Sequence, residues 1–432
     1  GNIPWVIIPQ ETQWRLHAVL DKASSGGEVV VAAVGGSVTA GGAVRWQDSY
    51  ASQFAHLLAL AFPAAQVRLE LGAKGDTTSA LTAFCLETLV GEAVDVLFVE
   101  FTLNDGVDFH RLKEPTATYE NLLRRAAVTY PSAATFGIGF WGQFFSLGRN
   151  FYTRHRALAA HYGLGWVAVD PLARAMVKAR LSTRAKMTAD QKGHPRNETY
   201  HMIAQLMLVG MVEAATCESQ VRRTRPPAPH PALFSSPTPL TISLPNPVNA
   251  ILRHAPLPTT THCDLVGLPK HNSSTGMLQG VNIMKSWQYV SIRWLGAAHP
   301  RLDQKLHLIP GKDLPTALRM LRNQHAGLEG GKSVVKGGKE ELLVSVKVVS
   351  QLMVSMCRES FFQNAYDGTC FPFRVLLEPS GTEVPMKPWL GRNYGMFVSS
   401  MPLPPGMHDV RVVRRPTFKC KPYACLAAIV GM

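Results

Sequence analysis

Five short apolar runs alternate with helical patterns along the first 220 residues, and this alternation limits the folds that the chain can adopt. Residues 29–34 lack the polar alternation of a half-exposed strand and are typical of a strand buried on both faces. Strands separated by helices form parallel sheets that are covered by helices on both sides. We therefore expect an α/β domain at this end. Its predicted strands are 28–34, 66–71, 94–101, 135–140 and 166–170, and its predicted helices are 48–62, 79–90, 117–130, 150–163 and 198–216.

The rest of the chain has a different composition. A length of 432 residues exceeds what one ordinary core holds, so at least two domains are expected. Residues 222–260 are rich in proline and predict an extended linker or a strap across the surface. Residues 261–432 contain short strand patterns divided by Gly, Pro and Asn, which predict a mainly antiparallel, β-sandwich-like domain. The sequence thus divides into 1–221, 222–260 and 261–432.

Charge and hydropathy exclude several classes of protein. The chain is 46% hydrophobic and 17% charged, which is typical of a folded globular protein. Its net charge of +14 invites a nucleic-acid partner, but the basic clusters at 222–225 and 411–421 have no interleaved aromatic residues. We interpret them as solvated basic faces and predict no nucleic-acid partner. No apolar run reaches the roughly 18 residues of a transmembrane helix, and residues 1–20 lack the pattern of a secretion signal.

The seven cysteines show no spacing that is typical of a metal site, so we predict neither a metal nor another cofactor. Two close pairs are candidates for local disulfides, Cys357 with Cys370 and Cys420 with Cys425. Two glycosylation acceptors occur, at Asn197 and Asn272. Together these features favour a secreted or endomembrane protein.

Four separated pieces of sequence carry the residues from which an active site could be built. Each lies at the carboxyl end of a predicted strand or just before the last helix, and such ends meet at one edge of a parallel sheet. The pieces contain Ser37, Gly75, Asn104, and Asp190 with His194. A serine hydroxyl becomes a nucleophile when a histidine takes its proton, and the resulting oxyanion needs donors already aimed at it. The N–H groups of Ser37 and Gly75 and the amide of Asn104 could be those donors.

The content and order of these pieces resemble the SGNH (GDSL-like) hydrolase family over about residues 28–210. The matching pieces are GGSVTAG, LGAKGDTTS, VEFTLND and DQKGHP, with Gly36 where the family commonly has Asp. The resemblance implies a flavodoxin-like three-layer α/β/α sheet and a serine nucleophile, Ser37, with His194 as its base. It also implies an oxyanion hole that includes Gly75 and Asn104.

The acid partner of His194 departs from the family pattern. The family's acid usually lies three residues before the histidine, where this chain has Gln191, whereas Asp190 lies four residues before it. Either Asp190 reaches the imidazole through a longer turn, or a backbone carbonyl orients the ring. We favour Asp190, because an imidazole that becomes positively charged benefits from a carboxylate, and Asp170 is the second candidate.

Each of these residues also has a structural interpretation. Ser37 could cap a helix, and Gly75, Asn104 and His194 could be ordinary turn or surface residues. Glu100 on a central strand is either paired inside the fold or placed near the site, and we favour the structural role. We also expect a structural role for His201. The coincidence of four pieces in the family's order is what favours catalysis.

Two functions remain open. The first is a serine esterase that hydrolyses small acyl esters, such as acetyl groups on carbohydrate, through an acyl-enzyme intermediate. The resemblance implies the ester class, and the β-rich second domain favours a carbohydrate by analogy. The alternative is an inactive SGNH scaffold with a structural or glycan-binding role. There, Trp287, Trp294 and Trp389 would stack on sugars, although we favour a core position for them.

Overall fold

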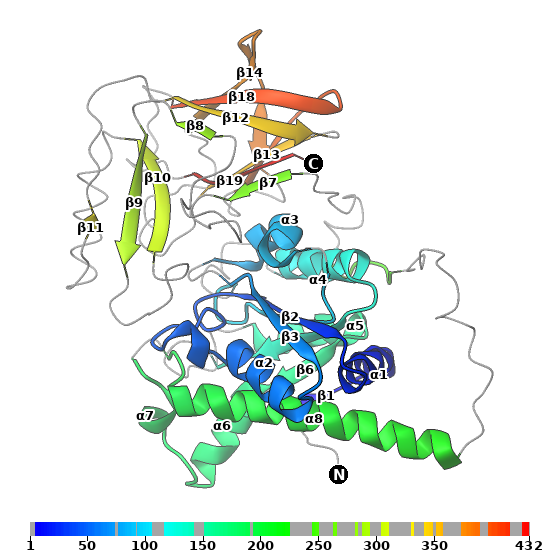
Figure 1. Cartoon of the computed structure of the whole chain (residues 1–432). Helices are drawn as coiled ribbons and strands as arrows, with labels where there is room; N and C mark the ends of the chain where they lie inside the picture. The colour runs from blue at the N-terminus through cyan, green and yellow to red at the C-terminus, as the bar shows by residue number, and fades with distance from the viewer. Residues whose placement is uncertain are drawn as a thin grey trace. The chain divides into compact units, whose positions relative to one another are not determined.

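The computed structural model forms two compact units, which are described separately (Figure 1). The first comprises residues 1–75, 89–107 and 116–255, and the second 76–88, 108–115 and 256–432. The structure describes residues 5–73, 77–91, 93–105, 116–141, 151–190, 193–224, 244–249, 262–265, 281–283, 287–293, 304–310, 330–331, 341–348, 351–356, 373–388, 396–414 and 426–431. The proposed boundaries at 221/222 and 260/261 remain a prediction.

The first unit is built on a six-stranded sheet with the strand order β1-β6-β5-β4-β2-β3. Its strands are β1 (Val6–Ile7), β2 (Glu28–Gly35), β3 (Gln66–Leu71), β4 (Val96–Glu100), β5 (Ala134–Gly139) and β6 (Gly165–Ala168). All neighbouring pairs from β2 to β6 are parallel, and β1 joins the edge of β6 in the antiparallel direction. Without β1, the order is that of a flavodoxin-like sheet, whose direction of winding changes between β2 and β4.

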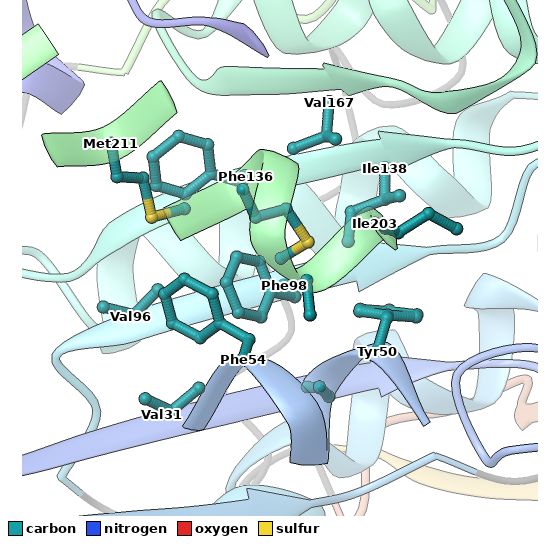
Figure 2. Close-up of a cluster of buried hydrophobic side chains, with 14 of the residues drawn as sticks. Val31, Tyr50, Phe54, Val96, Phe98, Phe136, Ile138, Val167, Ile203 and Met211 are labelled. Carbon is teal, nitrogen blue, oxygen red and sulfur yellow. The ribbon is translucent and has the colours of Figure 1, made fainter. Parts of the chain in front are cut away.

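Helices cover both faces of this sheet, as predicted. The helices of the first unit are α1 (Gln10–Ser24), α2 (Tyr50–Ala61), α4 (Ala117–Thr129), α5 (Tyr152–His161), α6 (Val169–Lys178), α7 (Arg184–Met187) and α8 (Asn197–Thr224), whereas most of α3 (Ser79–Val90) belongs to the second unit. Helices α1, α2 and α8 share one core with the sheet. Figure 2 shows Phe54 of α2 and Ile203 of α8 packed over Val31, Phe98 and Phe136 of the strands. Aromatic rings meet edge to face in this core, with the Phe54 and Phe98 centroids 5.0 Å apart.

The opposite face is covered by α4 and α5, where two glycines of β5 make room for aromatic rings. A Cβ at Gly137 would lie 2.6 Å from the Trp166 ring and 3.0 Å from the Tyr119 hydroxyl. A Cβ at Gly139 would lie 2.4 Å from the Tyr152 ring. The glycines in this strand are therefore required by packing.

Two predicted boundaries differ from the structure. Residues 169–170, expected at the end of a strand, begin α6, so Asp170 lies in the first turn of a helix. Helix α8 continues to Thr224, beyond the predicted end at 216 and into the segment assigned to the linker. Residues 197–224 contain no proline, whereas Pro226 and Pro227 follow and disfavour helical backbone just before them.

The end of the proline-rich segment lies against α4 and α5. Residues 244–249 are held by Glu120, which accepts hydrogen bonds from the N–H groups of Val248 (2.6 Å) and Asn249 (2.8 Å). Arg124 donates to the carbonyl of Pro245 at 2.8 Å. This part of the predicted linker is therefore a strap on the first unit.

The second unit contains two antiparallel sheets, in agreement with the predicted β-rich domain. One has the order β11-β9-β10-β19-β13-β17-β16 with β7 paired to β19, and the other has the order β15-β14-β18-β12-β8. Their strands are β7 (His262–Leu265), β8 (Val281–Ile283), β9 (Trp287–Arg293), β10 (Gln304–Pro310), β11 (Gly330–Gly331), β12 (Glu341–Val348), β13 (Leu352–Met356), β14 (Phe373–Glu378), β15 (Thr382–Glu383), β16 (Met386–Pro388), β17 (Met396–Ser399), β18 (Gly406–Arg414) and β19 (Leu426–Gly431). The apolar run 342–356 is divided between β12 and β13, which lie in different sheets.

Several sequence predictions fall outside the described residues, namely the two local cysteine pairs, Asn272, Trp294 and Trp389. A different cysteine, Cys85 in α3, is disulfide-bonded. Within the described ranges, no helix combines the length and the apolar character that crossing a membrane requires.

Candidate active site

Ser37 lies in the turn that follows β2, next to the point where the sheet changes its direction of winding. The chain coils tightly here, because the N–H of Ala40 donates to the carbonyl of Gly36 at 3.1 Å and that of Gly42 to Ser37 at 2.7 Å. The hydroxyl of Tyr200 in α8 donates to the carbonyl of Val38 at 2.9 Å. The residue after Ser37 is thus tied to the helix that follows His194.

The structure brings Ser37, His194 and Asp190 together in one hydrogen-bonded chain. Nε2 of His194 lies 2.9 Å from Oγ of Ser37, and Nδ1 of the same ring lies 2.6 Å from Oδ2 of Asp190. With the Nδ1 proton directed to the carboxylate, Nε2 is free to accept the serine proton. All three residues are partly buried, and the side chain of His194 is 17% exposed to solvent.

Residues 187–190 and 193–196 lie side by side, because the N–H of Ala189 donates to the carbonyl of His194 at 2.8 Å and that of Arg196 to the carbonyl of Met187 at 3.0 Å. Oδ1 of Asp190 accepts from the N–H groups of Gly193 (2.9 Å) and His194 (3.1 Å), which leaves Oδ2 for the imidazole. Gly193 has φ of +94°, a conformation that glycine adopts without strain. Trp141, just after β5, donates from Nε1 to the carbonyl of Gly193 at 2.7 Å. One carboxylate therefore both shapes the loop and contacts the ring.

The same contacts set the charge of Asp190. Burial by itself raises the pKa of this carboxyl group, but the hydrogen bond and charge of His194, with the two backbone N–H groups, bring the pKa below its usual value. Asp190 is therefore ionised at neutral pH. An ionised carboxylate at Nδ1 stabilises the imidazolium that forms when His194 takes a proton.

Asn104 lies beside the nucleophile turn. Its side-chain amide packs so closely on Gly36 that a Cβ at position 36 would lie 2.1 Å from Oδ1 and 2.8 Å from Nδ2. The amide therefore fills the space above Gly36, the residue just before Ser37. Gly75, the third predicted oxyanion donor, lies outside the described residues.

Other candidate residues lie in different surroundings. Asp170 pairs with Arg174, its Oδ1 2.9 Å from a guanidinium nitrogen, one turn along α6. Nδ1 of His201 lies 3.1 Å from the amide oxygen of Gln53 and links α8 to α2. Asn197 is exposed at the start of α8, three residues after His194. Among the described residues, no group of three or more His, Cys, Asp or Glu side chains could hold a metal ion.

Sequence reasoning missed three residues that shape the site. Gly42 gives the imidazole its space, since a Cβ there would lie 2.6 Å from Cδ2 of His194. Trp141 and Tyr200 hold the loops on either side. Trp141 could have been noticed because its indole N–H comes directly after a predicted strand that leads to the site. Tyr200 could have been noticed because it lies in the predicted helix that follows His194. Neither signal identifies the carbonyl that each residue contacts.

A flavodoxin-like sheet with a Ser–His–Asp chain at its switch point defines the class of SGNH-type hydrolases. The model of the GDSL-like Lipase/Acylhydrolase family matches residues 33–202 of this chain. No curated protein sequence matches the chain.

Three solved structures are similar to this chain to different extents. A two-domain esterase active on acetylated mannans is 16% identical, with a TM-score of 0.55, over 98% of this chain and 96% of the other. A putative GDSL-like lipase from Parabacteroides merdae is 18% identical, with a TM-score of 0.35, over 44% of this chain and 95% of the other. An acetyl xylan esterase is 15% identical, with a TM-score of 0.36, over 42% and 98% of the two chains.

Proposed function

We propose that the protein is a serine ester hydrolase that removes small acyl groups, acetyl above all, from carbohydrate through an acyl-enzyme intermediate. The observation that carries this proposal is the hydrogen-bonded order of Ser37, His194 and Asp190 in the part of the chain that matches the model of the acylhydrolase family. A histidine in contact with both a serine hydroxyl and a carboxylate is the arrangement that makes a hydroxyl nucleophilic.

The reaction follows from the geometry. Nε2 of His194 takes the proton of Ser37 as Oγ attacks the ester carbonyl, and Asp190 stabilises the imidazolium. The imidazolium then protonates the departing alcohol, and the acyl group stays on Ser37. Nε2 of His194 then deprotonates a water molecule, which attacks the acyl-enzyme. The acid is released, and the imidazolium returns the proton to Oγ of Ser37.

The tetrahedral oxyanion needs donors that are in place before the attack. We assign the N–H of Ser37 and the side-chain amide of Asn104 to this role, since the amide packs on Gly36, the residue just before Ser37. The N–H of Gly75 completes the proposed set by its place in the family's motif. Donors held by a strand end and a tight turn need little reorganisation during the reaction.

The carbohydrate part of the proposal is supported by fold. The likeness to an esterase active on acetylated mannans extends over 98% of this chain and therefore includes the β-rich second unit. We propose acetylated polysaccharide as the substrate class on this basis. The disulfide at Cys85 and the two glycosylation acceptors support a secreted or endomembrane protein, where disulfides persist.

A fluorophosphonate probe tests the chemistry directly, because it reacts with an activated serine. We expect one labelled serine in the wild-type chain and complete loss of label in Ser37→Ala. Asp190→Asn should slow labelling by about 10³-fold or more, since the wrong tautomer of His194 is then favoured. The matched variant Asp170→Asn alters a carboxylate paired with Arg174 and should label at the wild-type rate.

The substrate is tested separately by acetate release from acetylated mannan, with the Ser37→Ala chain as control. Labelling without acetate release would retain the hydrolase and overturn the substrate class. A folded wild-type chain that takes no label would instead favour the inactive scaffold with a structural or glycan-binding role.

A further inference from the structure

Glu100 is a charged residue at the end of a strand that is otherwise apolar. Strand β4 reads VLFVE, and all five of its residues are buried, with Glu100 fully enclosed. A buried carboxyl group costs free energy even when it is hydrogen-bonded, and an apolar residue of similar size often serves stability as well or better. Its presence therefore calls for an explanation other than stability.

The backbone of Glu100 contacts the nucleophile turn. Glu100 is paired with Gly35, the last residue of β2, and its carbonyl accepts a hydrogen bond from the N–H of Gly36 at 3.3 Å. Four residues further along the chain lies Asn104, whose amide packs on the same Gly36. Glu100 thus lies between the segments that carry the nucleophile and the proposed oxyanion donor.

The side chain of Glu100 joins three loops of the site. Oε1 accepts from the N–H (3.1 Å) and the hydroxyl (3.0 Å) of Thr102, in the loop that carries Asn104. Oε2 accepts from the hydroxyl of Thr39, in the nucleophile turn, at 3.4 Å, and this hydroxyl lies 2.9 Å from that of Tyr50. The hydroxyl oxygen of Thr102 in turn accepts from the N–H of Phe140 at 3.1 Å.

The third loop leads to the histidine. Trp141 follows Phe140 and donates to the carbonyl of Gly193, the residue before His194. Through two threonines and one tryptophan, a single buried carboxyl group is thus connected to the segments of Ser37, Asn104 and His194. These segments are remote along the chain, and β4 contributes no other polar side chain at this depth.

We propose that Glu100 is a positioning residue, which holds the turns of Ser37 and Asn104 in register through Thr39 and Thr102. The inference rests on the proposed hydrolase function and adds to it a residue that touches none of the reacting atoms. Burial raises the pKa of Glu100 to about 7, the hydrogen bonds from Thr102 lower it in part, and the nearby charge of Asp105 adds to the rise. The same network remains possible in both protonation states, because a protonated carboxyl group can donate to the Thr39 hydroxyl.

The test replaces Glu100 in the full chain and measures the rate of fluorophosphonate labelling together with kcat and KM for p-nitrophenyl acetate. Glu100→Leu should lower kcat and the labelling rate by about 10- to 100-fold, because a small misplacement of the nucleophile is costly, while KM changes by less than about threefold. Glu100→Gln keeps an acceptor for Thr102 and a donor for Thr39, so it should restore most of the rate.

Glu120→Leu is the matched control. Glu120 is as fully buried as Glu100, but among the described residues its carboxylate accepts hydrogen bonds from Tyr162, Val248 and Asn249, which lie outside the site. This variant should label at the wild-type rate. Equal rates for folded Glu100→Leu and wild type would overturn the inference, and so would equal losses in Glu100→Leu and Glu120→Leu.

If Glu100→Leu does not fold, Thr39→Val decides, since it removes the single hydroxyl that connects Glu100 to the nucleophile turn. We expect a labelling rate about three- to tenfold below wild type in the folded variant. A wild-type rate for Thr39→Val would overturn the inference. Failure of the proposed function has a different signature, because the wild-type chain itself would then take no label at Ser37.

Discussion

Individual side chains in this protein act through contacts that their neighbours in sequence do not reveal. Asp190 is the clearest example, since one carboxylate oxygen closes a loop and the other faces the imidazole. A search for an acid three residues before the histidine, which is the family's usual spacing, would have missed Asp190. The physical requirement is a carboxylate oxygen at Nδ1, and a loop one residue longer meets it when a glycine with positive φ closes the turn.

The ionisation of Glu100 predicts how stability depends on pH. Burial raises its folded pKa from 4.5 to about 7, and the nearby charge of Asp105 adds to the rise. The folded state therefore binds more protons than the unfolded state between these values, and stability falls as pH rises from about 4.5 through 7. The full loss is on the order of 3 kcal/mol.

Glu100→Gln has no titrating group at this position. The difference in free energy of unfolding between wild type and this variant should therefore change by about 3 kcal/mol between pH 4.5 and 7. The wild type is relatively more stable at the acidic end of this range. Urea unfolding at closely spaced pH values measures it. Parallel curves for the two proteins would show that Glu100 does not titrate there.

At the scale of elements, the site is formed by loops that leave neighbouring strands at the same edge. Strands β2 and β4 lie side by side and parallel, and the direction in which the sheet is wound changes between them, so the turn after one faces the loop after the other. Glycines in these loops let backbone and side chains approach closely. Gly36 admits the amide of Asn104, and Gly42 admits the imidazole of His194.

Gly42→Ala tests this close approach. The new Cβ would lie 2.6 Å from Cδ2 and 3.0 Å from Nε2 of His194, so the ring must move away from Ser37. We expect kcat/KM for an acetyl ester to fall by about 100-fold. Gly91→Ala is the matched control, because its Cβ meets no atom within 4 Å although φ is +77°. It should lower stability and leave kcat/KM unchanged, whereas similar losses of activity in both variants would contradict the prediction.

At the scale of the whole molecule, part of the predicted linker is a component of the first unit. Residues 244–249 are bound through Glu120, whose carboxylate also accepts a hydrogen bond from the hydroxyl of Tyr162 at 2.6 Å. A proline-rich segment has few hydrogen bonds of its own to offer, so the strap depends on groups supplied by α4 and α5. His161 adds one more, with Nε2 2.9 Å from the carbonyl of Asn246.

Glu120→Leu should release this strap. Removing the carboxylate leaves the N–H groups of Val248 and Asn249 without their acceptor, which should cost about 1–3 kcal/mol of stability. Limited proteolysis should then cut within 244–249 faster than in the wild type, and fluorophosphonate labelling of Ser37 should persist. Unchanged proteolysis would show that other contacts hold the strap.

The sequence by itself determined the α/β architecture, the β-rich character of the second unit, and the identity of Ser37, Asn104 and His194 as candidates. Apolar periodicity and glycine turns are local properties, and each strand and helix of the first unit's predicted pattern has its counterpart in the structure. Edge strand β1 and the division of 342–356 between two sheets were not predictable, because pairing partners distant in sequence decide them.

Only the tertiary structure decided which carboxylate faces His194 and what Glu100 contacts. Asp190 and Asp170 are alike in sequence, and the choice follows from a loop that folds back on itself and from an arginine one turn along α6. Glu100 contacts Thr39 across a separation of 61 residues. Such contacts arise when remote segments meet at a sheet edge, and no local pattern encodes them.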